Sequence, residues 1–208
     1  MYTPPLFAES ELSPLHDLME SRSFALLISP GGDLPVVSHL PLLIDRPAGP
    51  RGTLLGHMAR ANSQWRGLDG QPVLAIFSGP HSYVSPRWYE AGSAPVVPTW
   101  NYVAVHASGR VEIVDDREGK REIVRRSVDL YEQALPAPWT LPTGEDYDRL
   151  LDQIVGFRIV IDAIEGKWKI SQNQPIERQQ KVAQQLQQQG DPDSRAIAEL
   201  MQQRLGNR

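Results

Sequence analysis

The first half of the chain is a series of short apolar runs that end at glycine, proline or small polar residues. These runs cover residues 24–28, 36–44, 53–57 and 73–78. Residues 100–106 then alternate between apolar and polar side chains, and residues 110–114 follow across Ser108-Gly109, which predicts a hairpin. Short strands separated by turn residues are typical of an antiparallel barrel or sandwich. We therefore expect a mainly β fold.

Helical periodicity interrupts this pattern. A short helix opens at Ser13-Pro14, because serine caps a helix and proline suits its first turn. Residues 116–135 read as an amphipathic helix, and residues 143–154 as a second helix with Thr143 as its N-cap. The apolar face of the longer helix consists of Val124, Val128, Tyr131 and Leu135. Strand patterns return in residues 157–161 and 167–170, joined across Glu165-Gly166.

The C-terminal residues differ from the rest in composition. From Pro175 the chain is rich in glutamine and has a helical period, which breaks at Gly190-Asp191-Pro192. Its apolar residues are too few to build a core, so we expect this tail to pack on the domain or on a partner and to be partly disordered. The predicted organisation is a domain with inserted helices over residues 1–174 and a helical tail over residues 175–208.

Composition narrows the function classes. The 208 residues include no cysteine, which excludes disulfides, thiolate catalysis and cysteine-ligated metals and fits a reducing cytoplasm. A net charge of −4 argues against a globally basic nucleic-acid binder. No apolar run approaches the ~20 residues of a membrane span. The histidines have no metal-binding spacing, so no metal is expected. The sequence contains no phosphate loop and no dinucleotide-binding glycine motif, which argues against kinases and Rossmann dehydrogenases. It also contains no nucleophile elbow, which argues against a serine hydrolase.

The segment from Gly56 to Trp65 carries the clearest candidate chemistry. His57, Arg60 and Asn62 follow a strand, and imidazole, guanidinium and amide groups at a strand end can hold a phosphate by directed hydrogen bonds. Trp168 stands between two lysines on a late strand, a combination that suits a planar anionic ligand. Flavin mononucleotide (FMN) has both a planar ring and a phosphate.

Six segments together resemble the PaiB family of FMN-binding negative transcriptional regulators. They are residues 1–4, His39-Leu40-Pro41-Leu42, Gly56 to Trp65, Ser78 to Tyr89, Val97 to Gly109 and Gly166 to Asn173. The likeness runs in order from residue 1 to about residue 180. It implies a six-stranded antiparallel FMN-binding split barrel and a homodimer with FMN in a cleft between the subunits. Ser63 departs from the proline that we expect after Asn62, which loosens the turn.

The resemblance also implies roles for particular residues. Ser38, His39 and Leu40 would lie under the edge of the isoalloxazine ring, while His57, Met58, Arg60 and Asn62 would hold the ribityl chain and phosphate, with Arg60 the first choice for the phosphate. Tyr83, Ser85, Asn101 and Tyr102 would border the ring. The residues that would close the cleft are Trp168, Lys169 and Gln172. These assignments rest on superfamily analogy.

Three functions of different classes fit these observations. The first is an FMN-binding negative regulator, although the chain has no helix-turn-helix pattern. Its one cluster of arginines, Arg121, Arg125 and Arg126, is interspersed with acidic residues and reads as a solvated face. DNA is therefore a candidate partner that no recognisable DNA-binding motif supports. The alternatives are a flavin-dependent oxidoreductase acting on a small molecule and a flavin-free dimerisation module.

Overall fold

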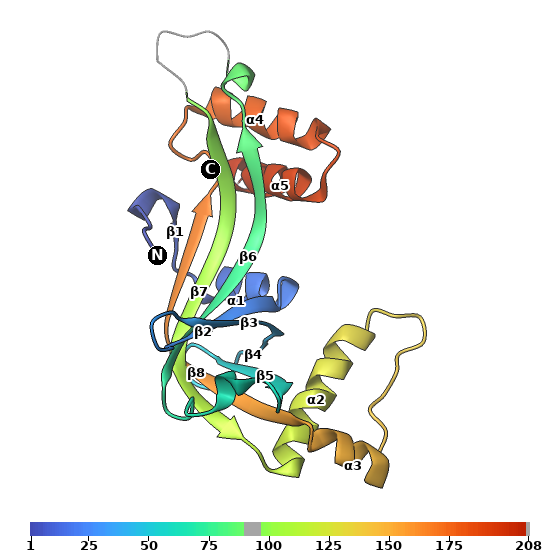
Figure 1. The fold of residues 1–208 in the computed structure, drawn as a ribbon. Helices are drawn as coiled ribbons and strands as arrows, with labels where there is room; N and C mark the ends of the chain where they lie inside the picture. Colours follow the sequence, from blue (N-terminus) through green and yellow to red (C-terminus); the bar gives the residue numbers. More distant parts are fainter. Residues whose placement is uncertain (90–96, 207–208) are drawn as a thin grey trace. The chain divides into compact units, whose positions relative to one another are not determined.

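The computed structural model describes residues 1–89 and 97–206, and within them a mainly antiparallel sheet carries peripheral helices (Figure 1). The strands are β1 (Ala8–Glu9), β2 (Phe24–Ser29), β3 (Val36–Pro41), β4 (Leu43–Asp45), β5 (Thr53–Ala59), β6 (Pro72–Val84), β7 (Thr99–Val114) and β8 (Ile154–Lys169). The helices are α1 (Leu12–Ser21), α2 (Arg117–Glu132), α3 (Glu145–Leu151), α4 (Ile176–Gln188) and α5 (Pro192–Gly206).

The strands follow the order β3-β2-β6-β7-β8-β5-β4, and β1 pairs with β8 at one side of this path. The registers of β2 with β3 and β6, of β4 with β5, and of β8 with β1 and β5 are antiparallel. The predicted fold class is thus confirmed. The sheet of the described residues has eight strands rather than six, because Leu42 separates β3 from β4 and the two-residue β1 adds a short pairing.

Two predicted turns are wrong, and glycine explains both errors. Residues 99–114 form the single strand β7, and residues 154–169 form the single strand β8. Gly109 lies in β7 where an added Cβ would stand 2.0 Å from the carbonyl oxygen of Val160. At Gly166 a Cβ would stand 2.2 Å from Leu15 Cδ2. Gly109 therefore permits close approach of two strands, and Gly166 permits close approach of α1 to β8, rather than a change of direction.

The chain divides into two compact units, and β6, β7 and β8 each contribute residues to both. Of the described residues, unit 1 contains 1–15, 78–89, 97–105 and 165–206. Unit 2 contains 16–77 and 106–164.

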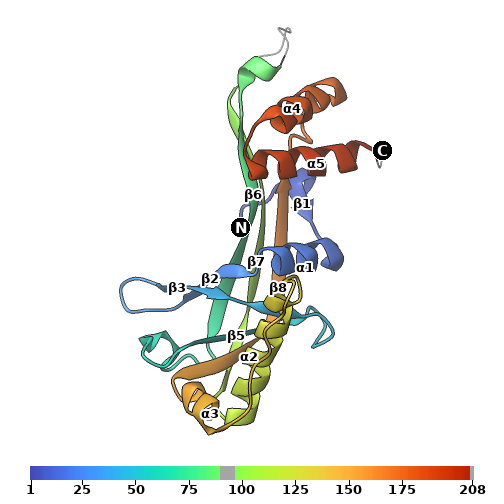
Figure 2. The same ribbon diagram turned by 90° about the vertical axis from the view of Figure 1, so that its right-hand side faces the viewer.

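In unit 2, α2 and α3 lie side by side next to the strands (Figure 2). Helix α2 begins after Asp116, whose carboxylate accepts a hydrogen bond from the Gly119 amide, as its predicted start requires. Its buried residues are Lys120, Ile123 and Ser127, so the buried face is offset from the predicted one. Helix α3 is shorter than predicted: it begins after Gly144 (φ 130°) rather than at Thr143, and it ends before β8 begins.

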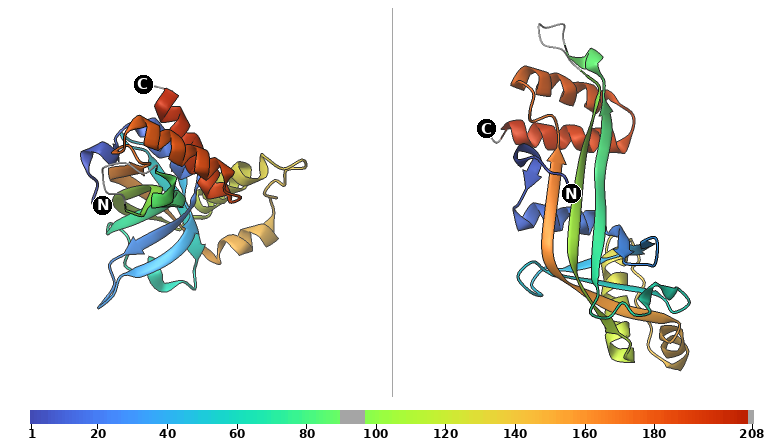
Figure 3. Two further views of the ribbon diagram at one scale, coloured as in Figure 1. Left: turned by 90° about the horizontal axis from the view of Figure 1, so that it is seen from above. Right: turned by 60° about the vertical axis from the view of Figure 1, so that its left-hand side comes forward.

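In unit 1, the helices α4 and α5 pack against each other (Figures 1 and 3). Val182, Leu186 and Ile197 are 0% exposed and Met201 is 1% exposed. The expectation that the tail packs on the domain is confirmed, since Ser194 Oγ lies 2.8 Å from Ser82 Oγ and Met201 Sδ lies 3.7 Å from Asn101 Nδ2. The expectation of partial disorder is wrong for residues 176–188 and 192–206, which are helical. The predicted helical tail and its break before Pro192 are confirmed over the described residues.

Candidate functional site

The fourteen residues proposed from the sequence divide between the two units. Unit 2 contains Ser38, His39, Leu40, His57, Met58, Arg60 and Asn62. Unit 1 contains Tyr83, Ser85, Asn101, Tyr102, Trp168, Lys169 and Gln172.

In unit 2, Asn62 joins the end of β5 to β3. Its Nδ2 donates to Ser38 Oγ at 2.9 Å, and its Oδ1 accepts a hydrogen bond from the Gln64 amide at 3.0 Å, which caps the 3-10 turn Ser63–Trp65. His39, the next residue of β3, points to the opposite face of the strand from Ser38, where it is exposed and its ring lies 6.3 Å from that of Phe24. Leu40 is partly exposed on the same strand. The fold thus brings together two segments that sequence reasoning had treated separately.

Gln64 is a buried residue of this cluster that sequence reasoning missed. Its Nε2 lies within 3.1–3.2 Å of Leu27 O, Ser29 Oγ and Val36 O, whereas its Oε1 is buried without a hydrogen-bond partner among the described residues. Rotating the amide would place its oxygen against two carbonyl oxygens, so this orientation is the one that satisfies the site. A buried acceptor without a donor carries a free-energy cost that a ligand hydroxyl or N–H group would remove.

His57 and Met58 occupy the middle of β5. Burial lowers the pKa of His57 below its ordinary value of 6.5, so the imidazole is neutral near pH 7 and offers one donor and one acceptor. Met58 is a core residue with 2% of its surface exposed. Its side chain supports the strand on which the imidazole is held.

Arg60 already has an anionic partner in this structure. Its guanidinium forms a bidentate pair with Asp115, with Nη1 3.2 Å from Oδ2 and Nη2 close to Oδ1. Nε donates to the carbonyl oxygen of Asp152 at 2.8 Å, and Nη2 also donates to that of Ile154 at 3.1 Å. The hydrogen bonds that Arg60 donates to Asp115 raise the pKa of Arg60 and lower the pKa of Asp115. One Nη1 hydrogen is left over for a ligand.

Trp65 adds an aromatic surface to this cluster. Its indole Nε1 donates to the carbonyl oxygen of Arg60 at 3.0 Å. The guanidinium carbons of Arg60 and Arg66 lie 5.7 and 5.9 Å from the centroid of its ring. Both distances fall within the range of cation–π attraction. Two cations are thereby held over the Trp65 ring.

In unit 1, Asn101 and Ser171 form a buried polar pair. Asn101 is 0% exposed, and its Nδ2 donates to Ser171 Oγ at 2.9 Å. Ser171 has a φ of 66°, the one non-glycine residue of the described chain in the left-handed region. A strained backbone held by a buried side-chain bond is characteristic of a site with a fixed shape. The two residues line a cavity of about 140 Å³ together with Lys169 and Tyr89.

Lys169 and Gln172 close the end of β8. Lys169 Nζ lies 2.5 Å from both Thr99 Oγ1 and the carbonyl oxygen of Trp100, and its pKa is lowered, first by burial and then by the charge of Lys167. Gln172 accepts a hydrogen bond from the Ile170 amide at 2.7 Å and donates to the carbonyl oxygen of Trp168. Gln172 therefore shapes the turn after the strand.

The aromatic residues of unit 1 are arranged differently from the sequence interpretation. The lysine that lies over an aromatic ring is Lys167, whose Nζ is 5.0 Å from the centroid of Tyr102, whereas Trp168 is partly exposed. Tyr83 meets Trp100 edge to face at 5.9 Å, and 54% of Trp100 is exposed. Ser85 caps the 3-10 turn Pro86–Trp88 by accepting a hydrogen bond from the Arg87 amide.

The sequence profile of a family described as "Putative FMN-binding domain" matches residues 1–163. The "Protease synthase and sporulation protein PAI 2" of Bacillus subtilis (strain 168) is 32% identical over 208 residues, which cover 99% of this chain and 98% of that protein. The chain belongs to this family. The predicted membership in the PaiB family is confirmed. The family match also supports FMN as the cofactor of the protein.

Further comparisons agree with the family and the fold. An uncharacterized protein of Emericella nidulans is 30% identical over 212 residues, covering 83% of this chain and 84% of the relative. The FAD and heme binding protein of Mycobacterium smegmatis has a similar structure, with a TM-score of 0.61 and 16% identity over 78% of this chain and 73% of that one. The flavocytochrome Anf3 of Azotobacter vinelandii gives a TM-score of 0.59 and 16% identity over 78% and 69% of the chains. The split-barrel fold is thus shared with flavin-binding proteins.

The side chains of unit 2 fit the chemistry of FMN. Ribityl hydroxyls and a flavin N–H group need acceptors, and the Gln64 oxygen is a buried acceptor without a donor. A phosphate needs cationic or neutral donors, which Arg66, Asn62 and the neutral His57 supply. Among the described residues no helix is long and apolar enough to cross a membrane.

Proposed function

We propose that the protein is an FMN-binding, PaiB-like negative transcriptional regulator that acts as a homodimer in the cytoplasm. The observation that carries this proposal is the relation to the Bacillus subtilis protein over nearly the full length of both chains. A match that includes the C-terminal helices supports a shared role for the whole chain, and not merely a shared cofactor fold.

Within this proposal, the residues that hold the flavin are those that the family resemblance implies, taken for each unit by itself. In unit 2, Ser38, His39 and Leu40 border the ring, while His57, Arg60 and Asn62 hold the ribityl chain and phosphate, with Met58 supporting them from the core. In unit 1 the residues that the resemblance implies are Tyr83, Ser85, Asn101, Tyr102, Trp168, Lys169 and Gln172. Bound FMN supplies a ring that can accept and return electrons, and the protein's residues bind and orient it.

Direct DNA contact by the arginines of α2 is disfavoured by their partners. Arg121 pairs with Asp148, Arg125 with Glu122 and Asp129, and Arg126 with Asp45 at 2.6 Å. Phosphate binding requires cations whose charge is not already neutralised by carboxylates. We therefore propose that repression acts through another protein or a small metabolite.

Transcript profiling tests the regulatory role. Deleting the gene should raise the level of specific transcripts, and restoring the full chain should lower them again. In a gel-shift assay with DNA from upstream of those transcripts, the purified protein should give no shift even at low salt, where phosphate contacts are strongest. Unchanged transcripts after deletion would remove the regulatory proposal. A salt-sensitive shift would show direct binding and reject only the indirect route.

A homodimer is expected because large apolar side chains are exposed at a strand that has one sheet neighbour. Among the described strands, β3 pairs only with β2. Val36 and Val37 of β3 are 39% and 46% exposed, and Phe24 at the start of β2 is 69% exposed. An exposed apolar edge strand is a surface that proteins usually cover.

Light scattering at micromolar concentration should give twice the chain mass of 23.3 kDa. Val37→Lys should shift the mass toward the monomer, whereas Val97→Lys, far from this strand in the sequence, should leave the edge intact. A monomeric wild-type chain would contradict the proposal.

A further inference from the structure

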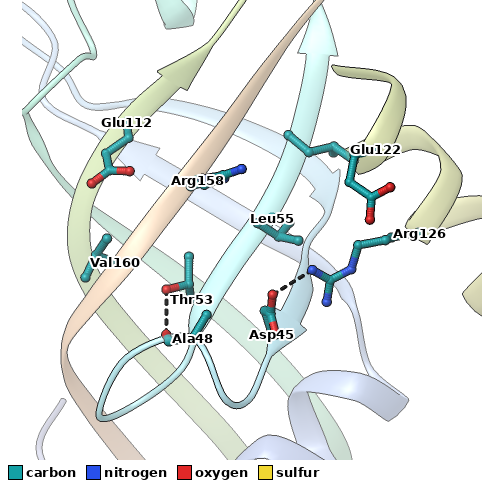
Figure 4. A pocket seen from close by; sticks show the side chains of 10 residues that line it. Asp45, Ala48, Thr53, Leu55, Glu112, Glu122, Arg126, Arg158 and Val160 are labelled. Atoms are coloured by element: carbon teal, nitrogen blue, oxygen red, sulfur yellow. Dashed lines mark hydrogen bonds and ion pairs between the residues drawn. The ribbon is translucent and has the colours of Figure 1, made fainter. Parts of the chain in front are cut away.

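Unit 2 contains a cavity of about 280 Å³ that none of the proposed flavin residues lines (Figure 4). Its floor comes from β5 and β8, where Leu55 is the register partner of Arg158 and Thr53 is the register partner of Val160. Because alternate residues of a strand share a face, these four side chains point to the same side of the sheet. The remaining lining residues are Asp45, Ala48, Glu112, Glu122, Ile123 and Arg126.

Three of the five charged groups that line this cavity are already neutralised. Arg126 Nη1 lies 2.6 Å from Asp45 Oδ2, and the carboxylate of Glu122 accepts two hydrogen bonds of 2.8 Å from Arg125. These pairs form one rim of the cavity next to α2, as Figure 4 shows for Asp45 and Arg126. They fix the shape of the cavity and leave little charge for a ligand to meet.

The remaining charges are one cation and one anion. In the part of the chain that the structure describes, neither the guanidinium of Arg158 nor the carboxylate of Glu112 has a hydrogen bond or an ion pair. They come from β8 and β7, which are neighbours in the sheet. The apolar part of the lining consists of Leu55, Ile123 and Val160, together with Ala48. A molecule that satisfies all of these groups carries a negative charge, a positive charge and an aliphatic part.

We propose that this cavity binds an aliphatic α-amino acid. Its carboxylate would meet the guanidinium of Arg158, which can bind both oxygens at once, and its ammonium group would meet Glu112. The side chain would pack on Leu55, Ile123 and Val160. A cavity of this size lies just below the ~300–1,000 Å³ of typical pockets for larger ligands, which fits an amino acid and excludes a flavin. The site is independent of the proposed flavin site.

The test is a titration of the full chain with L-leucine, followed by the amide resonances of Leu55 and Val160 in two-dimensional NMR. Saturable shifts at these amides are expected. Two analogues serve as controls on the wild-type protein: 4-methylpentanoate lacks the ammonium group, and 3-methylbutylamine lacks the carboxylate. Each should bind roughly tenfold or more weakly, the usual effect of losing one hydrogen bond to a charged group. Equal binding of either analogue, or no saturable shift with L-leucine, would overturn the proposal.

Variants assign the two charged contacts. Arg158→Gln should weaken L-leucine binding roughly tenfold or more and leave 3-methylbutylamine binding unchanged, because this amine has no carboxylate. Glu112→Gln should also weaken L-leucine binding roughly tenfold or more, but it should leave 4-methylpentanoate binding unchanged, because this acid has no ammonium group. Arg149→Gln is the matched control, because Arg149 is exposed on α3 and does not line the cavity. An Arg158→Gln protein that binds L-leucine like the wild type would overturn the assignment. The analogue titrations need no variant, so the test does not depend on how the variants fold.

Discussion

Gly109→Ala should reduce the free energy of unfolding by about 3 kcal/mol or more, since overpacking a rigid position costs this much when the neighbour cannot move. The added Cβ would stand 2.0 Å from the carbonyl oxygen and 2.8 Å from the carbonyl carbon of Val160, both in the backbone of the neighbouring strand β8. A backbone carbonyl cannot rotate away as a flexible side chain can, so β7 and β8 must separate locally. Urea unfolding followed by circular dichroism measures the change.

Gly190→Ala provides the comparison. Nothing lies within 4 Å of a Cβ at Gly190, and its backbone is outside the left-handed region. This substitution should change stability by no more than about 0.5 kcal/mol, the usual range for open surface positions. If Gly109→Ala unfolds at the same urea concentration as Gly190→Ala, then β7 does not pack against β8 at this point as the structure shows.

Gly109 and Gly166 show which structural role of a glycine the sequence alone does not reveal. Glycine is favoured both in turns and where two backbones approach closely, and the local sequence is the same in either case. Ser108-Gly109 and Glu165-Gly166 were therefore interpreted as turns. The predicted helix break at Gly190-Asp191-Pro192 is correct because a proline interrupts the hydrogen bonds of a preceding helix. A glycine without a proline does not end a helix so reliably.

Local signals located the helices better than the contacts between them. Asp116 marks the start of α2 because its side chain caps a residue three positions away. The burial of Leu186 and Ile197 depends on two helices meeting, which a count of apolar residues along the tail did not reveal. Most glutamines of this pair, such as Gln180, Gln184 and Gln202, are exposed, although Gln179 is buried, so a polar composition concealed an amphipathic pattern.

The same distinction applies to the candidate site. The segment from Gly56 to Trp65 was recognisable because its polar and aromatic residues are adjacent in sequence. The partners of those residues were not: Asn62 meets Ser38 across 24 positions, and Arg60 meets Asp115 across 55. Gln64 could have been included from its place in this segment, but its burial and its unsatisfied oxygen appear only in the folded chain.

The ion pair between Arg60 and Asp115 competes with the predicted role of Arg60 in binding the FMN phosphate. A guanidinium has five N–H groups, and the structure uses four of them on Asp115, Asp152 and Ile154. The carboxylate of Asp115 also repels a phosphate. For Arg60 to bind FMN in this arrangement, it must use its remaining Nη1 hydrogen, or its pair with Asp115 must open.

We expect Arg60→Ala to weaken FMN binding by roughly 1.5–3 kcal/mol, or one to two decades in Kd, because it removes a hydrogen bond to a charged group. Riboflavin lacks the phosphate, so it should bind the wild type and Arg60→Ala equally. Asp115→Asn is the matched control: it keeps Arg60 and removes the competing charge, and should therefore bind FMN at least as tightly as the wild type. Fluorescence titration of both flavins into the three proteins measures these affinities. Equal loss of FMN and riboflavin in Arg60→Ala would show instead that Arg60 serves to hold the end of β5 to Asp115, and the phosphate role would then be rejected.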